Sequence, residues 1–426
     1  MSDYKIETKC LHSGWVPKKG EPRMLPIIQS TTFKYDTTDE MGRLFDLKDD
    51  GYFYTRVQNP TNDMVAAKIA DLEGGVAALL TSSGQAANFY ATLNLCEAGD
   101  HLISTSTIYG GTFNLFAVTF KKLGIECTFV DPDASSEEIE KAFRPNTKLV
   151  FGETIANPAL TVLDIEKFAK LAHSHKVPLI VDNTFATPVN CQPFKWGADI
   201  VTHSTTKYMD GHAAQVGGAI VDSGNFDWES NAEKFSCLTT PDESYHGLIY
   251  TQAFGKKAYI TKATVTLMRD LGSIPSPMNA FILNLGLESM PLRVERHCYN
   301  AQKVAEFLNA HEKVSSVNYA GLPSDKYHER AKKYMPKGTC GVISFELKGG
   351  RESAVHFMDS LKLATIATHV ADAKTCMLHP ASHTHRQMND EQLKEAGVSP
   401  GMIRFSVGIE NIDDILSDLE QALKNA

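Results

Sequence analysis

The sequence lacks any long apolar run. No stretch approaches ~18 consecutive apolar residues, the length that a membrane-spanning helix requires. Its first ten residues, MSDYKIETKC, also contain no apolar core of the kind found in secretory signal peptides. We therefore expect a cytoplasmic protein with no membrane partner.

Positive charge is also scarce. The chain has 42 Lys and Arg residues against 51 Asp and Glu residues, which gives a formal net charge of -9. Nucleic acids and anionic membranes are bound mainly by clustered Lys and Arg, so this balance argues against both as partners. A local basic pocket for a phosphate or a carboxylate remains compatible with it. No internal repeat and no low-complexity tract is found.

Metal-binding patterns are weak or missing. The eight cysteines are scattered without a C-x-x-C pair, which favours small buried side chains over disulfides or zinc ligands. The segment LHPASHTHRQ does bring together His379, His383 and His385. Their spacing does not match a helical H-E-x-x-H motif, and Pro380 would break a helix there. We predict no metal site and favour a loop with hydrogen-bonded histidines, although a zinc-dependent hydrolase stays a possible reading.

What the sequence does contain is a regular alternation of short apolar runs and amphipathic stretches. This alternation predicts an α/β fold with a mostly parallel sheet, followed after residue 270 by a smaller α+β unit. We expect an N-terminal arm over residues 1–62 that contacts a neighbouring subunit, a cofactor-binding domain over 63–270 and a C-terminal domain over 271–426. The runs expected as strands of the main sheet are 76–83, 101–106, 125–131, 148–154, 177–183 and 198–204.

Polar residues gather where two of these strands end. Asp182 closes the run VPLIVD, and the run ADIVTHS leads directly to Lys207. In an open parallel sheet, ligands bind beyond the carboxyl ends of the strands. Pyridoxal phosphate needs a lysine for its Schiff base and a carboxylate beside its pyridine nitrogen. The alternative interpretation is that Lys207 is an ordinary surface lysine and that Asp182 caps a helix.

An anion site is expected beside this pair. Gly84 and Gln85 follow the first strand and open a helix, so their N–H groups would point at a phosphate, and Ser204 and Thr206 offer hydroxyls. A turn of small residues is also often no more than a helix cap.

Four further residues have both a functional and an ordinary interpretation. Tyr109 follows the second strand and is placed to stack on a planar ring, although loop tyrosines more often only pack. Arg404 lies within an apolar strand pattern, which suggests a bound carboxylate or a structural ion pair. Tyr54 and Arg56 lie in the arm and could be solvated loop residues.

Six motifs occur in order along the chain. They are YTRVQNPTND, LEGGVAALLTSSGQAA, ETIANPAL, VDNTFATP, HSTTKY and IRFSVGIE. This ordered set resembles the Cys/Met-metabolism family of pyridoxal-phosphate enzymes over nearly the whole chain. The resemblance implies fold type I of the pyridoxal-phosphate-dependent transferases and, within the family, is greatest to the O-acetylhomoserine sulfhydrylases. Methionine γ-lyases of the family typically carry cysteine where this chain has Gly111, which counts against that branch.

The resemblance implies a γ-replacement on O-acetylhomoserine by sulfide or a thiol, with a γ-lyase that releases 2-oxobutyrate as the alternative. It implies that Lys207 holds the cofactor and moves protons, and that Asp182 pairs with the ring nitrogen. Tyr109 would stack on the ring, Asn157 would reach its phenolic oxygen, and Arg404 would hold the substrate carboxylate. The implied phosphate ligands are Gly84, Gln85, Ser204, Thr206 and, from a neighbouring subunit of a homotetramer, Tyr54 and Arg56.

Two departures from the family pattern concern the substrate. Small residues usually follow the neighbour of the lysine, but here Tyr208 is followed by Met209 and Asp210. His369 stands where a serine or asparagine commonly helps to bind the carboxylate, and Ala371 replaces a usual glycine. We expect His369 to influence the balance of replacement and elimination.

Overall fold

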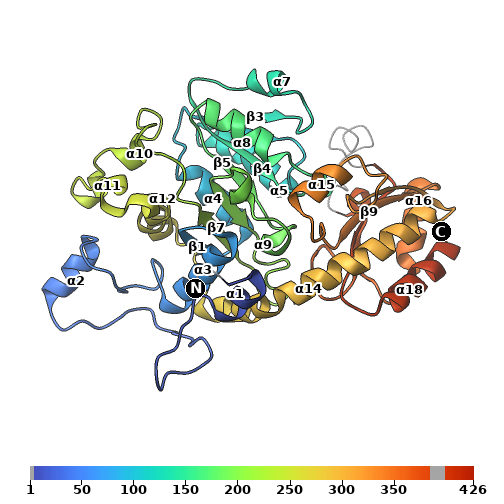
Figure 1. The fold of residues 1–426 in the computed structure, drawn as a ribbon, viewed down its shortest axis with the longest axis horizontal. Coiled ribbons are helices and arrows are strands. Elements are labelled where there is room, and N and C mark those ends of the chain that lie inside the picture. The colour runs from blue at the N-terminus through green and yellow to red at the C-terminus, as the bar shows by residue number, and fades with distance from the viewer. Residues whose placement is uncertain (1–3, 384–398) are drawn as a thin grey trace.

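The larger sheet carries the site. The structure is a computed structural model that describes residues 4–383 and 399–426, and within them seven strands form this sheet (Figure 1). Their order is β1-β7-β6-β5-β4-β2-β3, and β7 runs antiparallel to both of its neighbours while the other pairs are parallel. The strands are β1 (Ala77–Thr81), β2 (His101–Thr105), β3 (Glu126–Val130), β4 (Thr147–Glu153), β5 (Leu179–Asp182), β6 (Ile200–His203) and β7 (Gly218–Asp222).

All six apolar runs that we expected as strands are strands, so the predicted mostly parallel sheet is confirmed. The sequence analysis missed β7. This strand is only five residues long and begins at Gly218, directly after a second glycine. Its run of apolar residues is therefore too short to stand out in the sequence. It inserts between β1 and β6 and thereby separates two strands that both lead into the site.

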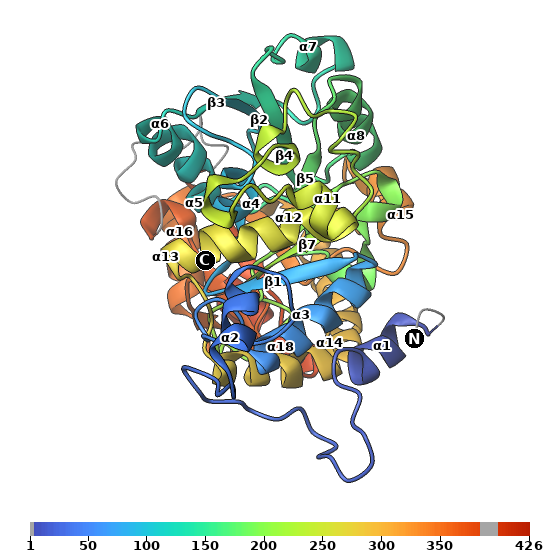
Figure 2. The same ribbon diagram turned by 90° about the vertical axis from the view of Figure 1, so that its left-hand side faces the viewer.

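Helices cover the larger sheet. In Figure 2, α3 and α12 lie on opposite sides of β1 and β7, and both helices contact these strands. A π-helical turn at Leu115–Thr119 joins α5 to α6, within the amphipathic stretch 113–124 that predicts one helix from the sequence. The helices of this region are α3 (Pro60–Glu73), α4 (Gly84–Leu93), α5 (Gly110–Asn114), α6 (Phe120–Lys122), α7 (Ser136–Glu140), α8 (Ile165–Ser174), α9 (Thr187–Asn190), α10 (Ser236–Thr239), α11 (Tyr250–Phe254), α12 (Ala258–Lys262) and α13 (Arg269–Leu271).

A second sheet lies in the C-terminal part, in the α+β arrangement that the sequence predicted. Its strand order is β10-β11-β12-β9-β8, and buried residues such as Phe345, Phe357 and Phe405 form a separate apolar cluster beneath it. Its elements are β8 (Val314–Asn318), α15 (His328–Tyr334), β9 (Val342–Leu347), α16 (Gly350–Asp359), β10 (Thr365–Ile366), β11 (Cys376–Leu378), β12 (Met402–Ser406) and α18 (Ile412–Lys424).

The long helix α14 (Pro277–Ala310) joins the two sheets. Its first half contributes Leu283 and Leu287 to the larger apolar cluster, and its second half contributes Val304 and Leu308 to the smaller one. The sequence alone predicts a long helix only from Glu288 to His311, after a segment at 273–279 that is rich in Pro and Ser. Pro277 is in fact the first helical residue, where its missing N–H costs nothing. The boundary at residue 270 stays a prediction.

The N-terminal segment is only partly packed. Helix α1 (Ile6–His12) contacts α3 and α14, whereas α2 (Thr38–Phe45) stands away from the body of the molecule (Figure 1). Thr37 and Glu40 form a capping box at the start of α2. Contact of this arm with another subunit stays a prediction. No helix in residues 4–383 and 399–426 is long and apolar enough to cross a membrane.

Candidate active site

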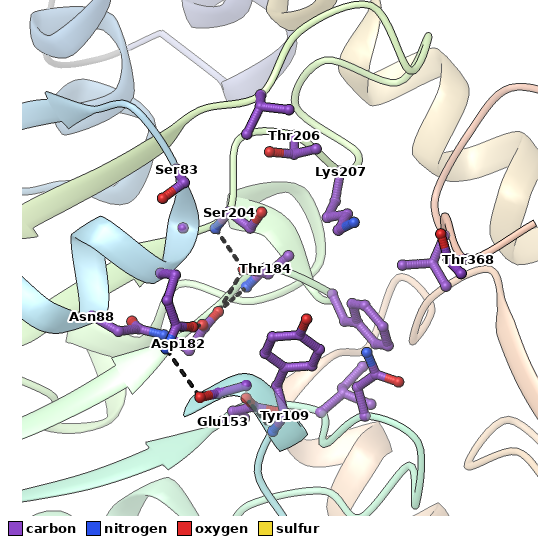
Figure 3. A pocket seen from close by; sticks show the side chains of 18 of the residues that line it. Ser83, Asn88, Tyr109, Glu153, Asp182, Thr184, Ser204, Thr206, Lys207 and Thr368 are labelled. Carbon is purple, nitrogen blue, oxygen red and sulfur yellow. Dashed lines mark hydrogen bonds between the residues drawn. The ribbon is translucent and has the colours of Figure 1, made fainter. Parts of the chain in front are cut away.

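A cavity of about 470 Å³ lies beyond the carboxyl ends of β1, β4, β5 and β6 (Figure 3). Thr368, Val370 and Arg404 close it from the side of the smaller sheet. It brings together nine of the twelve predicted site residues, which arrive from segments far apart in the sequence. These nine are Gly84, Gln85, Tyr109, Asn157, Asp182, Ser204, Thr206, Lys207 and Arg404.

Asp182 is held rigidly at the end of β5. One carboxylate oxygen accepts hydrogen bonds from the backbone N–H of Thr184 at 3.0 Å and from its hydroxyl at 2.5 Å. The other accepts a hydrogen bond from the side-chain amide of Asn88 at 3.2 Å. The Asn88 carbonyl oxygen in turn accepts a hydrogen bond from Thr202 at 2.6 Å. This network fixes a carboxylate at the cavity wall, as a pyridine nitrogen requires.

Lys207 enters the cavity from the turn after β6. Burial, and then the nearby Arg404 charge, lower the pKa of its amine to about 8. An ammonium group is disfavoured where water is excluded, so a substantial fraction of the side chain is a neutral amine near pH 8. The neutral amine is the form that attacks carbonyl carbon and accepts protons.

The start of α4 forms an anion cradle. Ser83 caps this helix by accepting the N–H of Ala86 at 3.0 Å, which leaves the N–H groups of the first turn at the cavity. A Cβ atom on Gly84 would lie 2.5 Å from Cβ of Ser204, so glycine is required for the helix to approach that strand end. The Gln85 side chain donates to the Gly111 carbonyl at 3.0 Å, and its backbone therefore serves the cradle.

Arg404 on β12 faces the cavity from the smaller sheet. The residue is only 7% exposed, and its guanidinium donates to Asn157 at 3.2 Å and to the Thr368 carbonyl at 3.0 Å. Its Nε–H has no partner among the described residues. Burial lowers the pKa of Arg404 to about 10, so it is still a cation at neutral pH. A buried cation with an unpaired donor is suited to bind a carboxylate.

Tyr109 starts α5 with half of its surface exposed. Its ring lies over Gly111, where a Cβ atom would approach Cε1 of the tyrosine to 2.5 Å. Gly111 therefore makes room for the ring in this position. Figure 3 shows the Tyr109 ring among the side chains that line the cavity, where it can stack on a planar ligand.

Glu153 is a site residue that the sequence analysis missed. It ends β4 opposite Asp182 in the parallel register, and its carboxyl accepts the backbone N–H of Tyr109 at 2.7 Å. Burial, followed by the charge of Asp182, raises the pKa of Glu153 well above its usual range. The signal was available, because Glu153 occupies the carboxyl end of a predicted strand, as Asp182 does.

The comparisons with known proteins agree with this geometry. Residues 7–424 match the family described as Cys/Met metabolism PLP-dependent enzyme. The chain belongs to this family. Its cofactor is pyridoxal phosphate, and the lysine, the carboxylate, the anion cradle and the aromatic ring around one cavity fit that group.

Individual relatives are similar over nearly their full length. The chain is 47% identical to the O-acetyl-L-homoserine sulfhydrylase of Leptospira meyeri, over 99% of this chain and 97% of that protein. It is 46% identical to the homocysteine/cysteine synthase of Saccharomyces cerevisiae, over 94% and 93%. A Campylobacter jejuni protein crystallised as an O-acetylhomoserine (thiol)-lyase, with pyridoxyl-lysine phosphate, superposes with a TM-score of 0.95 at 39% identity, over 99% and 100%.

Three predicted site residues of this family member do not line the cavity. Tyr54 and Arg56 lie at a separate hollow beside α2, where the Arg56 guanidinium is 5.1 Å from the Tyr54 ring centroid and donates to the Arg269 carbonyl. Their role toward a neighbouring subunit stays a prediction. His369 presents its carbonyl to Arg404 at 3.4 Å, while its side-chain Nε2 is buried without a partner among the described residues.

The histidine segment after β11 is hydrogen-bonded in the part that the structure describes. The two ring nitrogens of His379 lie 2.8 Å from the Ser382 hydroxyl and 2.9 Å from the Pro400 carbonyl. No group of three or more His, Cys, Asp or Glu residues suited to a metal occurs in residues 4–383 and 399–426. His385 lies outside the described residues.

Proposed function

We propose that this enzyme catalyses a γ-replacement in sulfur amino acid metabolism, converting O-acetyl-L-homoserine and sulfide into L-homocysteine and acetate. The C–O bond at the γ-carbon breaks and a C–S bond forms there. One hydrogen atom of hydrogen sulfide stays on the sulfur of homocysteine, and the other is released as a proton with acetate. With methanethiol in place of sulfide the product is methionine. The observation that carries the proposal is the convergence of Lys207, Asp182 and Arg404 on one cavity. The relatives named for this chemistry support it.

In this proposal each wall of the cavity holds one part of the cofactor. Lys207 bonds to it, Asp182 pairs with its ring nitrogen, and Asn157 reaches its phenolic oxygen. Tyr109 lies against the ring face, and the bound ring withdraws electrons from the substrate α-carbon. The phosphate is bound at the start of α4 by Gly84 and Gln85 and by the hydroxyls of Ser204 and Thr206.

The residues of the chain then supply binding and proton transfer. Arg404 binds the substrate carboxylate with its unpaired Nε–H and thereby orients the α-carbon toward Lys207. The Lys207 amine takes the α-proton and later returns it, which its lowered pKa favours. A second proton leaves the β-carbon before acetate departs, and a proton returns to this carbon after sulfur has added to the γ-carbon. Tyr109, at the cavity mouth, assists the leaving group.

The alternative within the family is γ-elimination, which yields 2-oxobutyrate, ammonia and a thiol from the same residues. Replacement is favoured by the similarity to named sulfhydrylases and by Gly111, where methionine γ-lyases of the family typically carry cysteine. We further propose a cytoplasmic homotetramer in which Tyr54 and Arg56 complete the phosphate site of a neighbouring subunit. Tyr54 and Arg56 are exposed and do not line the cofactor cavity of their own subunit, which supports a contribution to the cavity of a neighbour.

The test is product analysis of the purified yellow enzyme. Incubation with O-acetylhomoserine and sulfide should give equal amounts of homocysteine and acetate. Methionine alone, supplied to the same preparation, should give little 2-oxobutyrate. Abundant 2-oxobutyrate from methionine would make the enzyme a γ-lyase instead.

A further inference from the structure

The main chain that follows Lys207 is held by an arginine from a distant helix. Arg293 on α14 donates from Nη1 to the Tyr208 carbonyl at 2.8 Å, and its Nη2 lies 3.5 Å from the Met209 carbonyl. Its Nη2 also donates to the Gly286 carbonyl at 2.6 Å, and its Nε donates to the Ser289 hydroxyl at 3.1 Å. Arg293 therefore ties the lysine-bearing turn to α14.

The fit at this junction depends on the absence of two side chains. A Cβ atom on Gly211 would overlap the guanidinium of Arg293. A Cβ atom on Gly286 would overlap the carbonyls of Met209 and Asp210. Gly211 also has a φ of +71°, a conformation that other residues rarely adopt. The turn at residues 209–211 is thus fitted to Arg293.

The buried charge of Arg293 is unusual. The residue is 5% exposed and forms no ion pair among the described residues, although the carboxyl of Asp210 lies near enough to act on its charge. Removing a guanidinium from water is costly, and here its donors go mainly to backbone carbonyls. A second contact holds the same turn, since the Tyr208 hydroxyl accepts the N–H of Gly341 at 2.7 Å, just before β9.

We propose that Arg293 is a positioning residue for Lys207. It fixes the backbone on which the lysine swings, so that the amine returns to one place after each proton transfer. Arg293 itself touches neither the cavity nor the substrate. The proposal rests on the role of Lys207 in the proposed function, and it extends that role to a side chain on α14.

The experiment compares the holoenzyme with R293K, S289A and R296Q. The last is a matched control, because Arg296 is an exposed arginine on the same helix. Three quantities are measured: kcat and KM for O-acetylhomoserine, the pH at the midpoint of the visible absorbance change of the lysine-bound cofactor, and the melting temperature. Absorbance reports Lys207 directly, whether or not homocysteine is the product.

We expect R293K to lower kcat roughly 10- to 100-fold with little change in KM, because small misplacements of a reacting group have effects of this size. The absorbance midpoint should shift, R296Q should match the wild type, and S289A should shift the midpoint less, in the same direction. A wild-type kcat and midpoint in R293K would overturn the proposal. If R293K does not fold, S289A decides, and an unchanged midpoint there would also overturn it. A shifted midpoint in an enzyme that makes no homocysteine would refute the proposed function alone.

Discussion

Glu153 and Asp182 end neighbouring parallel strands and face each other in register at the cavity. Asp182 accepts three hydrogen bonds from Thr184 and Asn88. Glu153 is buried beside it, and both burial and the Asp182 charge raise the pKa of Glu153. Pairs of carboxyl groups in such unequal surroundings often divide their roles between a charged and a neutral form. Here Asp182 is available to the cofactor, and Glu153 holds the Tyr109 backbone.

This relationship predicts how Glu153→Gln behaves. Because the pKa of Glu153 is higher in the folded protein than in the unfolded chain, the folded state binds more protons, and stability falls as pH rises above the unfolded value. Glutamine does not titrate, so the variant does not lose stability in this way as pH rises. Its side-chain carbonyl can still accept the hydrogen bond from the Tyr109 N–H. The stability of the variant relative to the wild type should therefore increase between pH 5 and pH 8, as measured by urea denaturation of the holoenzyme. A difference that is flat or decreases with pH would contradict the account.

Glu153→Ala should behave differently from Glu153→Gln. Alanine leaves the part-buried N–H of Tyr109 without its acceptor, which costs on the order of 1 kcal/mol and releases the start of α5. We expect kcat/KM to fall roughly tenfold or more, since 1.4 kcal/mol corresponds to a factor of ten. The measurement is steady-state kcat/KM for the two variants under the same conditions. Equal values for Glu153→Ala and Glu153→Gln would refute the positioning of Tyr109 by Glu153.

Substitution of Gly111 tests the place of the Tyr109 ring. Gly111→Ala adds a Cβ atom 2.5 Å from the ring and should displace it, whereas Gly110→Ala adds one into open space. Because aromatic contacts contribute about 0.5–1.5 kcal/mol, the first variant should bind the cofactor up to roughly tenfold more weakly. The second should match the wild type in a cofactor titration of the apoenzyme. Equal affinities in the two variants would show that the ring does not stack on the cofactor.

Arg404→Lys tests the binding of the substrate carboxylate. Lysine keeps the charge but cannot reproduce a two-pronged contact or the bonds to Asn157 and Thr368. We expect kcat/KM for O-acetylhomoserine to fall roughly 100-fold, which corresponds to about 3 kcal/mol and lies within the range for a buried charge pair. Most of the change should be in KM. A variant whose KM is unchanged would show that the carboxylate binds elsewhere.

His369→Asn tests the departure beside Arg404. The His369 carbonyl contacts Arg404, and its Nε2 is buried without a partner among the described residues. Burial, followed by the Lys207 charge, lowers the pKa of His369, so its side chain is neutral at pH 7 and above. The smaller asparagine side chain should admit water and raise the share of 2-oxobutyrate among the products. We expect this share to rise less than tenfold, which corresponds to a change of less than about 1.4 kcal/mol. Product ratios with O-acetylhomoserine and sulfide at pH 7.5 provide the measurement. An unchanged ratio would remove His369 from any role in product choice.

Much of the site could be predicted because one rule governs it. Strand ends in a parallel sheet share an edge, so Asp182 and Lys207 could be placed together from the apolar runs that precede them. The same rule would have found Glu153. Arg293 could not be found in this way, because its contacts depend on how α14 packs against the lysine-bearing turn. The start of α14 was also missed, since proline signals both a linker and a first helical residue.

The account depends most directly on Lys207. In a holoenzyme preparation of Lys207→Ala, the visible absorbance of the lysine-bound cofactor and the conversion of O-acetylhomoserine and sulfide should both be lost. Lys195→Ala, which changes an exposed lysine, should keep both. Homocysteine formation by Lys207→Ala at the wild-type rate would contradict the central claim.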